Sequence, residues 1–349
     1  MKKFLYLLIT LSLIVFGCAK ANDPYQEEHK MKIVTSYSTI GNPLHMDSSG
    51  ELIFIAEDFG GFRIINKNTN NVVFYAKEVV QSLVPKYFQA KAINYNAETK
   101  VIVLTNRLQG TAGANWQMEF YDYSDQDTIS YIDMSSGDTI GILPVLWNNP
   151  SNPIYDFEIY RTTKSSYKVT RSNVNLSSLP VNRDSMSYSV YPDTPQKFSV
   201  DENYVTIAKG QTGVSVFNRL TGEEITSFDT PGYALQATKK NNYIFVADQQ
   251  LGLQVYKLDS NMNSSNIYSF DTTGYAENIE IKDNYLALSS TSGGVYLFDI
   301  TNSDNVKLVD RLSMTQVGYV NNVHFSKDGN EKVLYVLSRD KGVLKIQID

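Results

Sequence analysis

The chain has very little cysteine and histidine. Its 349 residues include one cysteine, so no disulfide can form within the chain. Only three histidines are present, and neither a His-Glu-x-x-His metal motif nor a Gly-x-Ser-x-Gly nucleophile turn occurs. The sequence therefore indicates no catalytic constellation, no metal site and no cofactor. Stability has to come from a hydrophobic core.

The chain also lacks an excess of basic residues. It has 31 Lys and Arg against 37 Asp and Glu, which gives a formal net charge of −6. Proteins that bind nucleic acid neutralise phosphates with clustered Lys and Arg, and anionic lipid attracts the same side chains. The composition therefore argues against nucleic acid as a partner and against electrostatic attachment to a membrane.

Only one long apolar run is present, at the very start of the chain. Residues 4–16 follow Lys2 and Lys3 and are interrupted only by Thr10 and Ser12. A helix of this length would span about 20 Å, whereas the hydrocarbon core of a bilayer is about 30 Å thick. The layout predicts a secretory signal peptide rather than a permanent membrane helix.

The single cysteine, Cys18, stands where the apolar run ends. The preceding residues give the sequence VFGC (15–18), which resembles a bacterial lipobox, in which an acylated cysteine follows a small residue. The alternative is ordinary cleavage after the small-residue pattern AKA (19–21). Each buried CH₂ of an acyl chain contributes about 0.8 kcal/mol, so several chains hold a protein firmly at a bilayer.

These features divide the chain into three parts. We predict a lipoprotein signal peptide over residues 1–17, a lipidated Cys18 with a flexible tether over 18–31, and one folded domain over 32–349. The membrane is then a partner through the lipid anchor. The expected location is outside the cytoplasm, at the outer membrane or cell surface rather than the inner membrane.

The folded region repeats itself. Similar segments read VTSYSTIG (34–41), ITSFDTPG (225–232) and IYSFDTTG (267–274), and strand patterns such as YIFVADQ (243–249) and GLQVYK (252–257) follow them. Alternating apolar residues rich in β-branched and aromatic types, bounded by Gly, Asn and Asp, are typical of strands. A set of four strands that repeats about every 40–45 residues is typical of a β-propeller. One four-stranded sheet cannot bury both of its faces alone, so several sheets pack face to face around an axis.

Counting the repeats predicts an all-β fold, a single propeller with about seven four-stranded blades, with six or eight as alternatives. The third unit (154–191) is the least regular, and IYDFEIY (154–160) is interpreted as its first strand. The last unit ends without a fourth strand, and an unpaired strand pattern (33–39) precedes the first unit. We therefore expect the N-terminal strand to complete the C-terminal blade and close the ring. Units are predicted to start near Gly41, Phe88, Pro153, Thr194, Pro231, Thr273 and Gln316.

The third strands and the turns after them carry a family resemblance. The segments GGFRIINKNTN (60–70), LGLQVYKLDSN (251–261) and GGVYLFDITNSDN (293–305) resemble the LVIVD repeat, in which a Gly-Leu-x-Ile/Val-hydrophobic-Asp strand enters an Asn/Ser-rich turn. The resemblance covers about residues 33–79 and 194–349. It implies a propeller of the bacterial cell envelope and no particular activity.

Long connections mark one rim as a candidate binding surface. They lie at EVVQSLVPKYF (78–88), where a short helix is expected, at RLQGTAGANW (107–116), and at residues 135–153. Both tryptophans of the chain, Trp116 and Trp147, fall in these segments. Exposed tryptophan often anchors a glycan or protein partner, although the same rings could simply fasten long loops to the rim.

A second candidate site comes from aligning the first strands of the repeats. One position is polar in every unit, and the next residue is always apolar, so the two sets point in opposite directions. Such a ring at the mouth of a central channel could bind an ion, a small ligand or water, or could simply satisfy hydrogen bonds between blades. Its members are His45, Asn94, Asp156, Lys197, Gln236, Asn278 and Asn322.

Two functions follow from these observations. The first is a lipid-anchored, non-catalytic binding or scaffold module of the cell envelope that recognises a protein, a glycan or an envelope component through its rim. The alternative is a channel-site propeller enzyme, a hydrolase or lyase, that uses the polar ring around His45. His324, from the last unit, would be a neighbour of His45 in a closed ring, although zinc usually requires three or four ligands.

Overall fold

The structure is a computed structural model. It describes residues 29–81, 84–109, 116–125, 130–135, 139–143, 156–163, 167–176, 182–329 and 331–349. The predicted signal peptide, Cys18 and Trp147 lie outside the described residues.

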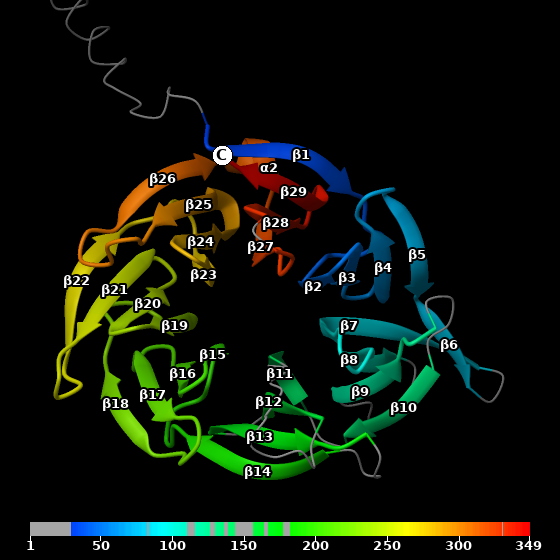
Figure 1. Cartoon of the computed structure of the whole chain (residues 1–349), viewed down its shortest axis with the longest axis horizontal. Coiled ribbons are helices and arrows are strands. Elements are labelled where there is room, and N and C mark those ends of the chain that lie inside the picture. Colours follow the sequence, from blue (N-terminus) through cyan, green and yellow to red (C-terminus); the bar gives the residue numbers. More distant parts are fainter. Residues whose placement is uncertain are drawn as a thin grey trace, which may run out of the picture.

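Seven sheets of antiparallel strands stand around a common axis (Figure 1). The strands run outward from the axis in chain order, with two exceptions: the N-terminal strand joins the last sheet as its outermost strand, and the second sheet has a fifth strand, β6, that pairs with β7. This arrangement is a seven-bladed β-propeller and confirms the predicted fold class. The first three blades comprise β2 (His45–Ser49), β3 (Leu52–Ala56), β4 (Phe62–Asn66) and β5 (Asn71–Ala76); β6 (Glu78–Gln81), β7 (Val84–Asn96), β8 (Val101–Gln109), β9 (Gln117–Asp122) and β10 (Ser130–Ser135); and β11 (Thr139–Leu143), β12 (Phe157–Thr163), β13 (Lys168–Val174) and β14 (Asn182–Ser189).

The remaining blades follow the sequence repeats closely. Only two short helical turns, η2 (Thr291–Gly293) and α2 (Met314–Val317), interrupt the strands in the described part of this region. Blades 4 to 7 comprise β15 (Phe198–Val200), β16 (Tyr204–Ala208), β17 (Val214–Asn218) and β18 (Glu224–Phe228); β19 (Gln236–Lys240), β20 (Tyr243–Ala247), β21 (Leu253–Leu258) and β22 (Ser264–Phe270); β23 (Ala276–Lys282), β24 (Tyr285–Ser290), β25 (Gly294–Asp299) and β26 (Lys307–Leu312); and β27 (Val320–Phe325), β28 (Val333–Ser338) and β29 (Gly342–Ile348) with β1 (Met31–Tyr37).

The predicted closure of the ring is confirmed. Strand β1 pairs antiparallel with β29, with Ile33 opposite Ile346 and Tyr37 opposite Val343. Gly342 begins β29 with φ +75°, and a Cβ atom there would lie 2.4 Å from the carbonyl oxygen of Tyr37. The glycine is therefore required both by the turn and by the close approach of the closing strand.

Two sequence-based expectations for blades 2 and 3 were wrong. The segment 78–88 forms no helix where it is described, because β6 pairs with the start of β7 as a β-hairpin. The first strand of blade 3 is β11, and IYDFEIY belongs to the second strand, β12. The long segment 144–155 thus separates the first and second strands of blade 3, instead of preceding the blade, and this shifted the register of the predicted repeat.

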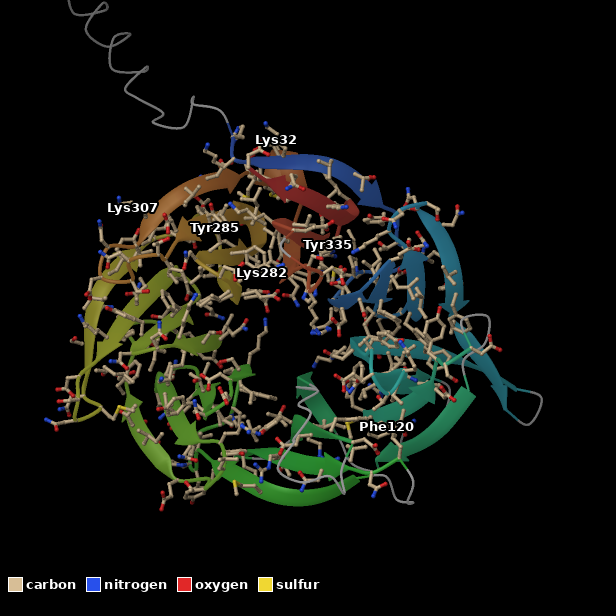
Figure 2. The ribbon with its side chains drawn as sticks, in the orientation of Figure 1. Lys32, Phe120, Lys282, Tyr285, Lys307 and Tyr335 are labelled. Carbon is tan, nitrogen blue, oxygen red and sulfur yellow. The ribbon has the colours of Figure 1, made fainter. Side chains whose placement is uncertain are left out.

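The core is divided among the gaps between blades. Seven buried clusters are present in the described part of the chain, and each joins one pair of neighbouring blades. Tyr335, labelled in Figure 2, packs with Tyr37 and Ile53 in the cluster that joins blades 7 and 1. Because every sheet buries both faces against its neighbours, the ring needs no disulfide.

The antiparallel strands define two rims. The upper rim carries the connections between the second and third strands and those that lead into the next blade. The lower rim carries the hairpins between the first and second strands and between the third and fourth strands. Strand β1 begins at the lower rim, where the Asp349 amide donates to the Lys30 carbonyl at 2.9 Å. The N-terminal segment therefore joins the domain at the lower rim.

Candidate functional site

Five of the seven polar-ring residues lie at or near the upper ends of the first strands, and a sixth, Asn94, is the third-last residue of β7 and lies nearer its lower end. His45 and Gln236 begin β2 and β19, and Lys197 directly precedes β15. The residues that follow them in the chain, such as Met46, Ala237 and Phe198, are buried between the blades. The other three members are Asn94, Asn278 and Asn322, in β7, β23 and β27.

The assignment of Asp156 to this ring is corrected by the structure. Asp156 directly precedes β12, the second strand of blade 3, and therefore lies at the lower rim. Its Oδ2 atom accepts a hydrogen bond from the Leu176 amide at 2.7 Å. The side chain stabilises the turn that follows β13 and does not face the upper end of the axis.

Most of the ring is engaged in contacts between neighbouring first strands. His45 Nδ1 lies 2.9 Å from the Ile93 carbonyl oxygen of blade 2. The Gln236 amide group both donates to the Ile279 carbonyl and accepts from the Ile279 amide at 3.0 Å. Asn322 Nδ2 donates to the Leu44 carbonyl at 3.3 Å. These bonds satisfy polar backbone groups near the axis, so the ring is first of all a structural feature.

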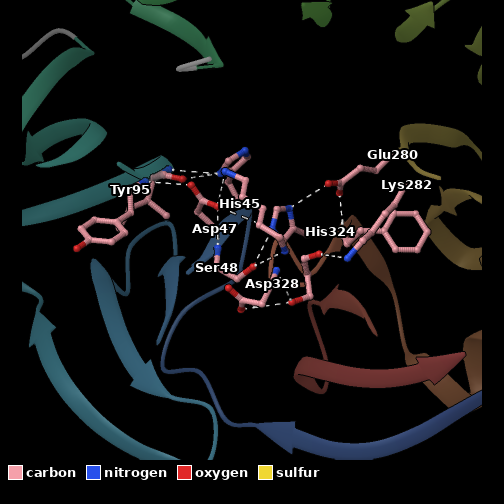
Figure 3. A network of polar contacts seen from close by, with 12 residues as sticks. His45, Asp47, Ser48, Tyr95, Glu280, Lys282, His324 and Asp328 are labelled. Atoms are coloured by element: carbon pink, nitrogen blue, oxygen red, sulfur yellow. Dashed lines mark hydrogen bonds and ion pairs between the residues drawn. The ribbon is translucent and has the colours of Figure 1, made fainter. Parts of the chain in front are cut away.

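A network of charged groups lies below His45, where the first strands of blades 6, 7 and 1 approach one another (Figure 3). His324 Nδ1 lies 3.3 Å from Glu280 Oε1, and His324 Nε2 lies 3.9 Å from Asp47 Oδ1. Lys327 Nζ lies 2.7 Å from the same Asp47 oxygen. Both carboxylates also accept hydrogen bonds from the backbone of a neighbouring blade: Asp47 from the Tyr95 amide and Glu280 from the Phe325 amide.

The two histidines differ in their affinity for a proton. Burial, together with the charge of His324, lowers the pKa of His45 to about 4. Burial also opposes the charged form of His324, but Glu280 and Asp47 raise the pKa of His324 above its usual range. A neutral and a protonated imidazole can thus occupy adjacent blades. No cluster of three or more metal-ligating His, Cys, Asp or Glu side chains occurs among the residues that the structure describes.

Of the two tryptophans, only Trp116 can be placed. It is half-buried at the upper rim, directly before β9, and Lys91 Nζ lies 5.5 Å from the centre of its ring. The contact is a cation–π interaction with a side chain of the first strand, β7. Trp116 is therefore partly used to fasten its connection to the blade.

A small hollow lies on the opposite, lower side. Its volume is about 290 Å³, and the hairpins of blades 1, 2 and 7 line it, with Ser48, Tyr95, Glu98 and Asp328 among the lining residues. The hydroxyl of Ser48 already contacts His324 Nε2 at 3.4 Å. The hollow is thus separate from the ring and is bordered by the charged network.

Exposed apolar side chains mark the upper rim, a feature that the sequence analysis missed. Of the twelve exposed large hydrophobic residues in the described part of the chain, seven lie on upper-rim connections and one, Leu220, on the lower rim. The other four lie on the outer strands β1 and β5. The sequence signal that could have identified these residues is an apolar side chain next to Gly, Pro or Asp in a connection between strands. The upper-rim members are Ile40, Phe59, Tyr167, Tyr191, Leu251, Tyr275 and Met314.

The fold and the site define a seven-bladed β-propeller with an unevenly exposed pair of rims. No family model matches the chain, and no curated protein matches it in sequence. Among solved structures, the β-propeller domain of Myceliophteria thermophila Cps50 (Swd1) is similar, with a TM-score of 0.64, 10% identity, and coverage of 91% of this chain and 99% of that one.

A computationally designed protein, Ika8, is also similar in fold. Its TM-score is 0.58 at 11% identity, and the alignment covers 91% of this chain and 100% of the designed one. Likeness at this level of identity shows the fold alone. None of the helices in the described ranges is long and apolar enough to cross a membrane.

Proposed function

We propose that this chain is a lipid-anchored binding module of the bacterial cell envelope that recognises a protein, glycan or envelope component through its upper rim. The observation that carries the proposal is the uneven exposure of the two rims. Tyr191 is 74% exposed on the upper rim, next to Tyr167 in an edge-to-face pair with ring centres 5.3 Å apart. Exposed aromatic side chains gathered on one face are typical of recognition surfaces.

The position of the N-terminal segment supports the same proposal. The segment that would carry the lipid on Cys18 joins the domain at the lower rim, where Met31 donates to Asp310 Oδ2 at 2.7 Å. A membrane anchor on that side leaves the upper rim free to face a partner. The LVIVD-like third strands fit a propeller of the envelope, and we include membership of that family in the proposal.

Lipid anchoring is tested by a Cys18→Ser substitution in the full chain. If Cys18 is acylated, the variant leaves the membrane fraction and is recovered as soluble protein, because no acyl chain holds it at the bilayer. A Ser12→Ala variant within the apolar run serves as the matched control and should stay with membranes. Membrane association of Cys18→Ser equal to that of the unchanged chain would refute the anchor.

Recognition is tested with matched rim variants. We expect Phe59→Ser and Tyr191→Ser to reduce the capture of detergent-solubilised envelope components on immobilised protein. Leu220→Ser, an exposed leucine on the lower rim, is the control and should leave capture unchanged. Equal capture by all three variants would exclude the upper rim as the recognition surface.

The alternative function, a hydrolase or lyase acting at the ring around His45, is supported by one observation. His45 and His324 lie on adjacent blades with opposite shifts of pKa, as an acid and a base would need. The binding proposal is favoured because most ring side chains are occupied by hydrogen bonds between blades. A His45→Ala variant that abolished hydrolysis of an envelope substrate would reverse this preference.

A further inference from the structure

The hollow on the lower side is bounded by hairpins from blades 1, 2 and 7. Its polar lining comes from the ends of β2, β7 and β27 and from the residues that follow them, and includes Ser48, Ser49, Asn96, Lys327 and Asp328. A water molecule occupies about 30 Å³ in the liquid, so a volume of about 290 Å³ has room for about ten of them. A ligand with a similar number of non-hydrogen atoms therefore fits.

Charges of both signs line the hollow, and two of them are already paired. Lys327 Nζ lies 2.7 Å from Oδ1 of the buried Asp47. Asp328 Oδ1 accepts from the Gly50 amide at 2.7 Å, and its Oδ2 atom contacts Lys67 Nζ. A lone anion would meet the carboxylate of Asp328, and a lone cation would meet the ammonium of Lys327. The lining therefore disfavours a ligand with a net charge.

The lining offers hydrogen-bond donors as well as acceptors. Asn96 is 5% exposed, and its Oδ1 atom accepts from the Glu98 and Thr99 amides at 2.8 and 3.1 Å. Among the described residues, no partner takes the N–H groups of the Asn96 side chain, so they remain as donors. An ammonium group has three N–H donors, and only one of those of Lys327 can face Asp47. A hydroxyl group both donates and accepts, so a ligand rich in hydroxyls matches this lining.

The walls of the hollow are held by contacts that exist without a ligand. The Ser48 hydroxyl accepts from the Lys327 amide at 3.2 Å and lies 3.4 Å from His324 Nε2, within the charged network (Figure 3). Tyr95, the aromatic member of the lining, stacks on the buried ring of Phe54 with centres 4.4 Å apart. A wall that is already ordered loses little conformational entropy when a ligand binds.

We propose that this hollow binds one neutral sugar unit in its pyranose form. Lys327 and Asn96 donate to the oxygen atoms of the sugar. The carboxylates of Glu98 and Asp328 accept from its hydroxyl groups, and bonds to charged groups are stronger than those between neutral groups. The site lies at the lower end of the axis, so it adds a second binding site to the recognition proposed for the upper rim.

Calorimetric titration of the full chain with glucose, galactose and N-acetylglucosamine tests the site. We expect saturable binding of at least one of these sugars with a dissociation constant of about 1 mM, as for a small ligand held by a few hydrogen bonds. Lys327→Met and Glu98→Gln should each weaken that binding by about tenfold, because each removes one charge-assisted hydrogen bond.

Two matched variants serve as controls. Lys257→Met removes a lower-rim lysine that is paired with Asp304 at 2.8 Å, as Lys327 is paired with Asp47. Glu202→Gln changes an exposed glutamate in the first hairpin of blade 4, the counterpart of the hairpin that carries Glu98. Both should bind the sugar as the unchanged chain does. Equal losses in the controls would show a non-specific effect of charge and overturn the site.

The ligand class has its own test. Tighter binding of glucosamine, glucuronic acid or free serine than of every neutral sugar would overturn the neutral class, and no saturation by any of the three sugars up to about 100 mM would remove the site. Methyl glycosides distinguish the two sources of a sugar: affinity that is retained fits the terminal unit of a glycan, and affinity that is lost fits a free monosaccharide.

Folding and the rim proposal are checked independently. Circular dichroism of each variant identifies unfolding, and Glu98→Gln, at an exposed position, provides the reading if Lys327→Met does not fold because Asp47 has lost its lysine. Capture of envelope components by the rim variants is measured separately, so failure of sugar binding leaves the rim proposal standing.

Discussion

The two rims are built from the same strands but use their residues differently. On the lower rim, polar side chains complete the turns that end the third strands: Asn66 Oδ1 accepts from the Asn68 amide, Asn218 Oδ1 from the Leu220 amide, and Asp299 Oδ1 from the Thr301 amide. Such bonds fix tight turns within a blade. On the upper rim, the connections within blades and between blades leave apolar side chains in solvent.

This difference separates residues that hold the ring from residues that are free to bind. A turn side chain whose acceptors are occupied by its own backbone has little left for a partner, whereas an exposed tyrosine at 74% accessibility contributes little to the folded state. Substitutions should therefore affect stability at the ring closure and in the buried pairs, and affect binding at the exposed upper positions.

The largest effect on stability is expected where the ring closes. Tyr37 is fully buried in the closing strand, and its hydroxyl donates to the Lys67 carbonyl at 3.1 Å. Tyr37→Ala should cost about 3–5 kcal/mol in the free energy of unfolding, because it leaves a cavity between blades 7 and 1. Tyr191→Ala, at the exposed upper rim, should change it by less than about 0.5 kcal/mol. Chemical denaturation compares the two variants. Equal losses of unfolding free energy would contradict the separation between residues that stabilise the ring and residues that are free to bind.

A smaller loss is expected at a buried ion pair that holds the upper rim to blade 1. Glu57 and Arg63 are in contact, and Glu57 Oε2 accepts from the Ile40 amide at 2.9 Å. Glu57→Gln leaves the buried guanidinium of Arg63 without its counter-charge, which should cost about 3 kcal/mol. The unfolding midpoint in denaturant measures the loss. A midpoint unchanged from that of the parent would show that water reaches Arg63.

Acid should lower the stability of the domain through His45, at the upper end of β2, and not through the histidine at the lower rim. Because the pKa of His45 is lowered to about 4 from 6.5, the unfolded chain binds a proton in this range before the folded chain does. Stability should therefore fall as the pH drops from about 6.5 to 4, by about 3 kcal/mol from this group. His45→Asn should flatten that part of the pH profile of unfolding.

The matched control for the acid effect is a histidine at the lower rim. His29 is 44% exposed and contacts Asp310 at 2.9 Å. His29→Asn should leave the slope between pH 6.5 and 4 in place. If this variant flattened the profile and His45→Asn did not, the assignment of the acid sensitivity to the upper end of β2 would be wrong.

The smallest effect is expected at the surface of the lower rim. Lys32 Nζ lies 2.5 Å from an Asp349 carboxylate oxygen, with the two side chains 57% and 45% exposed. Lys32→Ala should change the free energy of unfolding by less than about 1 kcal/mol, because solvent and salt screen an exposed pair. Thermal unfolding at low and high salt measures it. A loss as large as that of Tyr37→Ala would show that this pair, and not the buried strand, closes the ring.

The sequence predicted the ring because its regular blades repeat the same turn chemistry. Gly252 and Gly294 begin third strands where a positive φ is required, and the strands before and after them alternate in the same way. The closure by residues 33–39 could be predicted because one strand pattern was missing at the C-terminus and one was present at the N-terminus.

The candidate site was predicted less well, for two physical reasons. In blade 3, residues 144–155 come between the first and the second strand in the sequence, so Asp156 was counted in a first strand although it precedes a second strand. The partners of His45 and Gln236 are backbone groups of the next blade, at Ile93 and Ile279, which no side-chain pattern reveals. The exposure of Tyr191 or Phe59 likewise depends on which rim a connection occupies.

Site-specific photo-crosslinking in intact cells tests the central claim most directly. A photoreactive side chain placed at Phe59, at Tyr191 or, as the lower-rim counterpart, at Leu220 reports what lies next to each position. The account predicts a defined covalent adduct from Phe59 and Tyr191 and none from Leu220. Adducts that form at Leu220 while the two upper positions remain free would contradict it.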